Sequence, residues 1–307
     1  MKPLNIGTKM RDTETKQNVI VKADSINAET GDRATTLLLT RFPYTLIQEA
    51  ATHRLISQGT CNFYVLDSTN PFTELTSRSS ASTRAIPVER LIQSVINDPF
   101  IPNWSKHQKG MSGIEDDDAE FKAKMSVIHK RHMWASIVEA REMVRLGAHK
   151  QHINDILKPF LRIPILVTAT QNGWNNFIKL RTDKSCRVEF REYALDIKRA
   201  LEESKPEVLQ VGQVHMPFKE VMHPNLTLRE QKQVASARCA RLSYSSHDGV
   251  FSLERDLELF NTLLREGHMG PFEHILTAVS KDSNLNLRTF VGFYSFRAEI
   301  EDNNFLV

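Results

Sequence analysis

The stretch TTLLLTRFPYTLIQEAATHRLIS, residues 35–57, reads as a strand that leads into a helix. Residues 35–40 form a β-leaning apolar run, which predicts a strand. Over residues 44–57 the spacing is helical, and Glu49 and His53 stand four apart, where their side chains can meet. The apolar face of this helix consists of Ile47, Ala50 and Ala51. The stretch therefore predicts a helix that carries a glutamate and a histidine beside its apolar face.

A second segment, RSSASTR at residues 78–84, concentrates two guanidinium groups and four hydroxyl groups. Small hydroxyl residues let backbone N–H groups approach a ligand closely, and arginine offers a rigid fork that matches phosphate. The segment is therefore a candidate cradle for a nucleotide phosphate, although taken alone it also fits a Ser/Thr-rich loop with solvated charges. Residues 58–77, between the two segments, contain a strand-like CNFYVL and a turn-like DSTNP, which predicts an inserted hairpin or flap.

The composition indicates a folded protein of the cell interior. The chain has 307 residues, 40% of them apolar and 25% charged, which is enough for a large core. A net charge of +3 gives no reason to expect binding to polymeric nucleic acid. The three widely spaced cysteines, Cys61, Cys186 and Cys239, indicate neither a disulfide framework nor a zinc site. With no apolar leader and no membrane-spanning run, we expect a cytoplasmic protein without membrane attachment.

The rest of the chain alternates helical patterns with short extended pieces. NVIVKA (residues 18–23) and ILVTAT (residues 165–170) predict strands, and VLQVGQVHMP (residues 208–217) reads as extended. Helical spacing is found over residues 86–98, 119–146, 149–157, 187–201 and 253–265. The apolar stripe of residues 119–146, which includes Trp134, fits a core or a subunit interface better than a cofactor site. The aspartates of GMSGIEDDD (residues 110–118) fit a helix cap better than a cation site.

The segment GHMGPFEH, residues 267–274, gathers two histidines and a glutamate around two glycines and a proline. Its spacing, H-x4-E-H, differs from the H-E-x-x-H arrangement of zinc enzymes. Pro271 also argues against a continuous helix that would present both ligands. We therefore predict no metal site.

Taken together, these motifs resemble those of the flavin-dependent thymidylate synthases, and more narrowly a branch, often viral, in which the motif order is rearranged. In the usual order, ARVSY and GH-x-x-PFEH segments precede an R-H-R-x-x-S…S-x-R signature. Here the counterparts of the signature, THRLIS (52–57) and STR (82–84), come first, and ARLSY (240–244) and GHMGPFEH come last. DPFIP, HKQ, VTAT, W-x-NF-x-x-LR, RCAR-x-SY and HDG of the branch also have counterparts in this chain.

The resemblance implies an enzyme that moves the methylene group of methylenetetrahydrofolate to C5 of dUMP and reduces it with flavin hydride, giving dTMP. It implies FAD as cofactor, NADPH as electron source, and a homotetramer with FAD sites at subunit junctions. The fold that it implies is α/β (α+β), with helices packed on a largely antiparallel sheet in a single domain, residues 1–307. The flavin carries the electrons in such chemistry, and the protein contributes positioning and electrostatics.

Carried over residue by residue, the resemblance assigns two groups of side chains. The flavin-binding residues would be His53, Arg54, Asn176, Ser243, His268 and Glu273. The nucleotide-binding residues would be Glu49, Arg78, Ser82, Arg84 and Arg181. The catalytic residue among these would be Arg181, which would face the uracil ring and stabilise negative charge as C5 becomes nucleophilic. Plainer interpretations exist: His53 as a core histidine, Glu273 as the cap of a turn, and Arg181 as the partner of Asp183 or Glu189.

The chain departs from the family pattern at four places. Thr52 replaces the first arginine of the signature, residues 58–77 are an insertion, and Ser79 stands where the branch has Asn. The fourth departure is the most serious, because Asp155 occupies the position where relatives carry a phosphate-binding arginine. A carboxylate repels a phosphate dianion. Either the ligand is not dUMP or a nearby cation compensates, the candidates being Arg78, Lys158 and Arg162.

These departures leave other functions open beside thymidylate synthesis. One is C5 hydroxymethylation of dUMP, and another is methylation or hydroxymethylation of dCMP, with the insertion reshaping the pocket. A third, from a different class, is a flavin- or nucleotide-binding protein that has lost catalysis.

Overall fold

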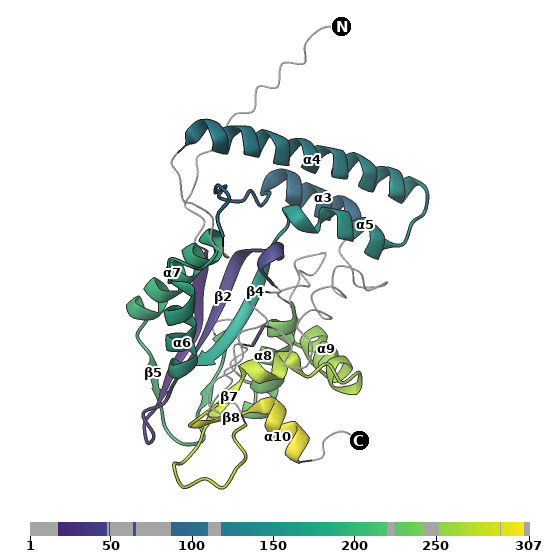
Figure 1. Cartoon of the computed structure of the whole chain (residues 1–307). Helices are drawn as coiled ribbons and strands as arrows, with labels where there is room; N and C mark the ends of the chain where they lie inside the picture. Colours follow the sequence, from purple (N-terminus) through teal and green to yellow (C-terminus); the bar gives the residue numbers. More distant parts are fainter. Residues whose placement is uncertain are drawn as a thin grey trace, which may run out of the picture.

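A five-stranded sheet with strand order β3-β4-β2-β1-β5 lies at the centre of the structure, a computed structural model (Figure 1). The strands are β1 (Val19–Asn27), β2 (Arg33–Pro43), β3 (Tyr64–Val65), β4 (Arg162–Thr170) and β5 (Glu207–Leu209). Neighbouring strands run antiparallel except for β1 and β5. The fold is thus mixed α/β around a largely antiparallel sheet. The structure describes residues 18–47, 49, 64–65, 87–109, 118–219, 225–241, 252–288 and 290–303.

The predicted strand at residues 35–40 is confirmed as the middle of the sheet. It forms part of β2, which pairs with β1 on one side and β4 on the other. Leu37 lies opposite Val167, and Leu39 lies opposite Ile165, and all four side chains are buried. A strand covered on both faces needs nearly continuous apolar residues, which explains the runs in both strands. The strands predicted from NVIVKA and ILVTAT are likewise confirmed as parts of β1 and β4.

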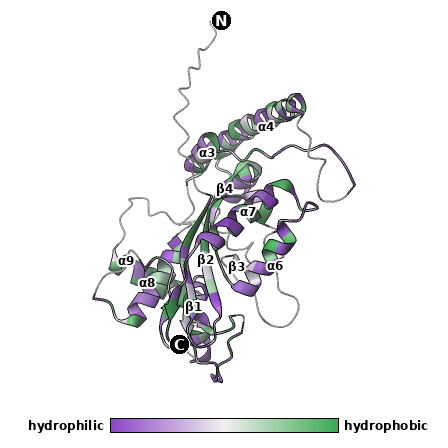
Figure 2. Ribbon diagram, turned by 90° about the vertical axis from the view of Figure 1, so that its left-hand side faces the viewer, coloured by the Kyte–Doolittle hydropathy of each residue, from purple (hydrophilic) through white to green (hydrophobic). Residues whose placement is uncertain are grey.

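Helices cover both faces of this sheet (Figure 2). On one side lie α6 (Gln171–Arg181) and α7 (Val188–Glu203), and on the other lie α8 (Leu228–Arg241) and α9 (Leu253–Arg265). The predicted bounds of α9 are confirmed, with Ser252 accepting a hydrogen bond from the backbone N–H of Arg255 at its start. Helices α6 and α8 are absent from the sequence-based prediction. The buried face of α8 consists largely of small residues, Ala235, Ser236, Ala237, Cys239 and Ala240, which give little apolar contrast.

A second, three-stranded sheet is formed by β6 (Val214–His215), β7 (Leu276–Ala278) and β8 (Phe293–Ser295) in that order. The segment GHMGPFEH ends in a short 3-10 helix, η4 (Gly270–His274), immediately before β7. The last described helix, α10 (Phe296–Asp302), follows β8 directly. None of the described helices combines the length and the apolar character that crossing a membrane would need.

A layer of three helices lies at one end of the sheet (Figure 1). It consists of α3 (Val88–Asn97), α4 (Ala119–Arg145) and α5 (Lys150–Leu157), which confirms all three predicted helices. The carboxylate of Asp118 accepts a hydrogen bond from the backbone N–H of Phe121, 2.9 Å away, so it caps α4 as predicted. Gly147 follows the end of α4 with a φ of 75°, a left-handed conformation that glycine adopts without strain.

The apolar stripe predicted on residues 119–146 is not buried as a whole. Met133 and Ile137 lie in a core shared with α3 and α5. In contrast, Val127, Trp134 and Val138 are 67%, 50% and 66% exposed. Spacing alone could not separate these groups, because a helix packed on one side can carry apolar residues on two faces. The outer face of α4 therefore has an apolar strip of its own.

A chain of buried hydrogen bonds connects the two sheets. The imidazole of His215 on β6 contacts Ser25 Oγ of β1 at 2.9 Å and Thr36 Oγ1 of β2 at 2.8 Å. Thr36 in turn contacts Thr168 of β4 at 2.6 Å, and Thr168 contacts Nδ1 of His274 at 2.8 Å. All five side chains are buried, so each hydrogen bond replaces one that water would have provided.

Burial of His215 predicts a stability that depends on pH. Its complete burial lowers the pKa of His215 to about 4, against about 6.5 in the unfolded chain. The folded state then binds fewer protons, so this contribution is present above pH 6.5 and is lost as pH falls toward 4. The loss should reach roughly 3 kcal/mol, measured by urea unfolding at a series of pH values.

A His215→Gln variant tests this expectation, because it removes the titrating imidazole that lies between the two sheets. Its free energy of unfolding should fall less steeply between pH 6.5 and 4 than that of the wild type. The matched control is His152→Gln, which changes an exposed histidine on α5 and should leave the slope unchanged. Equal slopes in all three proteins would contradict the role of His215.

Candidate functional site

Glu49 and Arg181, both predicted to face a pyrimidine, form an ion pair in the structure. Arg181 is the last residue of α6, and Glu49 follows the 3-10 turn η1 (Tyr44–Leu46) at the end of β2. Their side chains are 14% and 19% exposed. The sheet and α6 therefore bring together two charged residues that are 132 positions apart in the chain.

The alternative partners considered for Arg181 have other contacts. The carboxylate of Asp183 accepts hydrogen bonds from the backbone N–H and the hydroxyl of Ser185. The carboxylate of Glu189 accepts a hydrogen bond from Arg187 Nε at 2.9 Å. Among the described residues, Glu49 thus forms an ion pair with Arg181 across a long stretch of sequence, in place of Asp183 or Glu189.

Phe190 and Cys186 also lie beside Arg181. The guanidinium carbon lies 4.6 Å from the centroid of the Phe190 ring, which is a cation–π contact. The Cys186 thiol lies 3.9 Å from Arg181 Nη1. Burial raises the pKa of Cys186, with Arg181 opposing the shift, so this sulfur stays a thiol rather than a nucleophilic thiolate. The arginine is therefore fixed between a carboxylate and an aromatic wall.

Asp155, the most serious departure from the family pattern, has a cation beside it. Lys158 Nζ lies 2.5 Å from Asp155 Oδ1, one helical turn further along the chain. Burial opposes protonation of Lys158, but its contacts with Asp155 and Tyr44 outweigh this and raise its pKa. Arg162 is engaged elsewhere, with the carbonyl of Arg41 at 3.2 Å. Of the two candidates that the structure describes, Lys158 is thus the one that pairs with Asp155.

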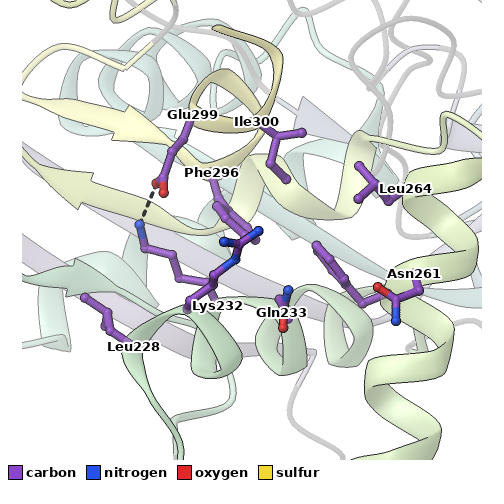
Figure 3. Close-up of a pocket in the computed structure, with 10 residues that line it drawn as sticks. Leu228, Lys232, Gln233, Asn261, Leu264, Phe296, Glu299 and Ile300 are labelled. Carbon is purple, nitrogen blue, oxygen red and sulfur yellow. Dashed lines mark hydrogen bonds and ion pairs between the residues drawn. The ribbon is translucent and has the colours of Figure 1, made fainter. Parts of the chain in front are cut away.

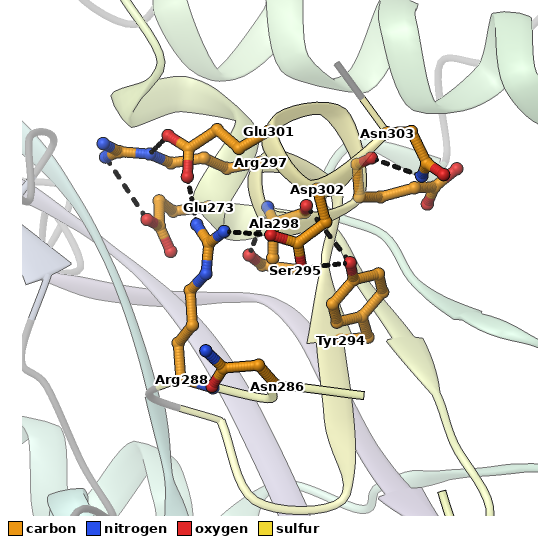
Figure 4. A network of polar contacts seen from close by, with 11 residues as sticks. Glu273, Asn286, Arg288, Tyr294, Ser295, Arg297, Ala298, Glu301, Asp302 and Asn303 are labelled. Atoms are coloured by element: carbon orange, nitrogen blue, oxygen red, sulfur yellow. Dashed lines mark hydrogen bonds and ion pairs between the residues drawn. The ribbon is translucent and has the colours of Figure 1, made fainter. Parts of the chain in front are cut away.

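Glu273 lies in a network of charged side chains at the start of the second sheet (Figure 4). It is buried in η4, and Arg297 of α10 lies 3.3 Å from its carboxylate. Arg297 also pairs with Glu301 at 2.6 Å, and Glu301 contacts Arg288. Arg288 continues to Asp302 at 2.7 Å. An ion pair with α10, more than a turn cap, therefore fixes Glu273.

The other predicted residues lie on separate elements or outside the described part of the chain. Asn176 is half-buried on α6, and His268 is exposed after α9, with its Nε2 3.5 Å from Glu266. His53, Arg54, Arg78, Ser82, Arg84 and Ser243 lie outside the described residues, as does most of the predicted flap at residues 58–77. Tyr64 and Val65, within the CNFYVL piece of that predicted flap, form the strand β3 and pair with β4.

A cavity of about 410 Å³ opens between α8, α9 and α10, where the sequence predicts no site (Figure 3). Phe260, Leu264 and Phe296 line it with apolar surface, and Lys232 and Glu299 pair across it at 2.6 Å. The Lys232 ammonium also lies 5.4 Å from the centroid of the Phe296 ring. Lys232 is only 6% exposed. The sequence alone gave no sign of this burial, which depends on how α8 packs against α10. The charge of Lys232 is satisfied within the chain.

Within the described residues, no three histidine, cysteine, aspartate or glutamate side chains gather closely enough to hold a metal ion. Comparison of the chain with protein-family models finds no match, and comparison with the curated proteins finds none either. The functional assignment therefore depends on the motifs in the sequence and on the geometry around Arg181.

Proposed function

We propose that this protein transfers a one-carbon unit from methylenetetrahydrofolate to C5 of dUMP and reduces it with a flavin, as a thymidylate synthase does. The ion pair between Arg181 and Glu49 is the observation that carries the proposal. The motifs assign each of these residues to the pyrimidine, although they belong to segments far apart in the chain. A pyrimidine site requires these two side chains to lie close together in a half-buried position. A chance resemblance of the motifs would give no reason to expect this.

The chemistry of the pair suits a uracil ring. Uracil presents one N–H group between two carbonyl oxygens. A carboxylate such as Glu49 accepts a hydrogen bond from the N–H, and a guanidinium such as Arg181 donates to a carbonyl oxygen. Cytosine presents a lone pair at the same ring nitrogen, which a carboxylate repels. The pair therefore favours dUMP over dCMP as substrate.

Arg181 would also act on the reaction itself. As C5 attacks the incoming carbon, negative charge develops on the ring oxygens, and a preorganised guanidinium stabilises it. The Phe190 ring on one side of Arg181 keeps water away and so strengthens this interaction. No side chain has to attack the ring, which agrees with a Cys186 sulfur that stays protonated.

The residues assigned to the flavin have suitable chemistry for its polar edge. Asn176 offers an amide, His268 an imidazole and Glu273 a carboxylate that Arg297 holds in place at 3.3 Å. A bound flavin would supply the hydride that reduces the transferred carbon. These residues come from three separate elements of one chain, as expected if complete sites form only at the junctions of a homotetramer.

The proposal is tested by incubating the purified protein with dUMP, methylenetetrahydrofolate, NADPH and FAD, and measuring the mass of the nucleotide. A gain of CH2 is the expected result. A gain of CH2O would replace the proposal by a hydroxymethylase, and product from dCMP alone would replace the substrate. An unchanged nucleotide in every case, with a colourless protein that takes up no FAD, would overturn it.

Replacement of Glu49 by glutamine should alter the choice of base. The amide keeps the shape of Glu49 but loses the charge that pairs with Arg181. We expect kcat/KM for dUMP to fall by about a hundredfold, as for loss of a charged hydrogen bond. Activity on dCMP relative to dUMP should rise, because an amide N–H can donate to the ring nitrogen of cytosine.

The matched control for this variant is Glu202→Gln, which changes an exposed glutamate on α7. It should leave both activities unchanged. If Glu49→Gln retains the kcat/KM and the base preference of the wild type, Glu49 does not contact the pyrimidine.

A further inference from the structure

The outer face of α4 carries exposed apolar side chains in a regular pattern. Val127, Arg131, Trp134 and Val138 follow one another at spacings of four, three and four, which places them on one face of the helix. Val127, Trp134 and Val138 are at least half exposed. The opposite face packs on α3 and α5, and α4 lies at the edge of the molecule (Figure 1).

Over residues 127–138 the spacing is that of a short coiled-coil seam. In a heptad, positions a and d alternate at spacings of three and four, and Val127, Arg131, Trp134 and Val138 occupy d, a, d and a. Within the part of the chain that the structure describes, no helix covers this seam, and no ion pair engages Arg131. A seam of this kind buries its apolar side chains only against a second helix.

The seam is complementary to itself in one orientation. In an antiparallel pair of identical helices, each residue meets the one at equal distance on the other side of the two-fold axis. The midpoint between Val127 and Val138 is also the midpoint between Arg131 and Trp134, and it lies close to the middle of α4. A valine therefore meets a valine, and a guanidinium meets an indole, two groups that can form a cation–π pair.

The charges at the ends of the helix fit the same register. Glu120, near the start of α4, would meet Arg145, its last residue, at both ends of the pair. In the same register, Lys124 of one copy lies opposite Arg141 of the other, so two like charges meet. Each of these already has a carboxylate beside it, because Lys124 pairs with Glu120 at 2.6 Å and Arg141 pairs with Glu89 at 2.7 Å. The repulsion between Lys124 and Arg141 is therefore small.

We propose that α4 is the contact through which two copies of this chain associate, antiparallel about a two-fold axis between Arg131 and Trp134. The exposed faces of two α4 helices bury less than the standard interface of about 1,600 Å². This contact alone would thus hold a dimer with a dissociation constant on the order of micromolar, or serve as one interface of a larger assembly. The assignment concerns association only and is independent of the chemistry proposed for Arg181.

Charge substitutions with rescue test both the contact and its orientation. Val138→Glu and Val127→Lys should each weaken association at least about tenfold by sedimentation velocity, because each buries an unpaired charge. The double variant Val127→Lys/Val138→Glu should recover it, since position 127 of one copy meets position 138 of the other. Val208→Glu, at an exposed valine of β5, is the control and should keep the mass of the wild type.

Cysteine pairs provide a second readout that does not depend on affinity. Val127→Cys/Val138→Cys should form a covalent dimer under mild oxidation. Within one helix these positions are about 16 Å apart, which is too far for a disulfide in the same chain. Val127→Cys alone should not link efficiently, because its counterpart lies equally far away in the antiparallel pair. A monomeric wild type, unchanged association in both charged variants, a double charge variant that fails to recover, or efficient linking of Val127→Cys alone would each overturn the proposal.

Discussion

Replacement of Arg181 by alanine should abolish turnover while leaving the flavin bound. The substitution removes the guanidinium that would stabilise charge on the pyrimidine, and loss of one such donor typically costs 10²–10³ in kcat. Because the same change also removes the ion pair between Arg181 and the half-buried Glu49, we expect a loss of at least about 10³. Turnover is measured as dUMP-dependent NADPH oxidation, and bound flavin by its visible absorbance.

Two controls separate this catalytic role from a structural one. Lys179→Ala changes an exposed cation on the same helix and should keep full activity. Arg181→Lys keeps the positive charge but loses the planar fork, so an intermediate activity is expected. If Arg181→Ala folds, binds flavin and keeps turnover within about tenfold of the wild type, the role given to this residue is wrong.

Replacement of Asp256 by alanine should cause a large loss of stability. Asp256 on α9 is 0% exposed, and its carboxylate accepts hydrogen bonds from Arg238 Nε at 2.5 Å and Arg241 Nε at 2.6 Å. Removing it leaves two largely buried guanidiniums without this carboxylate. Breaking a buried pair in this way typically costs about 3–5 kcal/mol, and we expect a decrease of this size in the free energy of unfolding.

The free energy of unfolding of Asp256→Ala is measured in urea and compared with that of the control variant Glu254→Ala. Glu254 is an exposed acidic residue on the first turn of the same helix, so its removal should cost under about 0.5 kcal/mol. A cost below about 1 kcal/mol for Asp256→Ala would show that the arginines find other partners. Since α8 ends at Arg241, shortly before Ser243, the variant should also bind flavin less well if Ser243 contacts it.

Elements whose buried positions are clearly more apolar than their exposed positions were predictable from the sequence. The bounds of α9 follow from its regular spacing, and TTLLLT becomes the central strand because it is apolar enough to be covered on both faces. Contrast is weak in α8, whose core side is made of alanine, serine and cysteine, and this helix was missed. On α4, spacing revealed the apolar residues but not which of them α3 and α5 would cover.

The candidate site was predictable only in part, because its residues are distant in sequence. Periodicity placed Glu49 on a helical segment, but no local pattern could pair it with Arg181 on α6. That pairing depends on how β2 and α6 pack together. The ion pair between Asp155 and Lys158 was predictable, because residues three apart on a helix are neighbours.

The helical layer has a consequence for the order in which the molecule folds and opens. Helices α3, α4 and α5 have an apolar cluster separate from that of the sheet, and Tyr44 packs against both. The chain enters this layer after β2 and returns from it into β4, so the central strand pair must wait for a long loop to close. The helices can form first as a local unit. Amide protons of α4 should accordingly exchange with solvent through a partial opening of lower free energy than the one that releases β2.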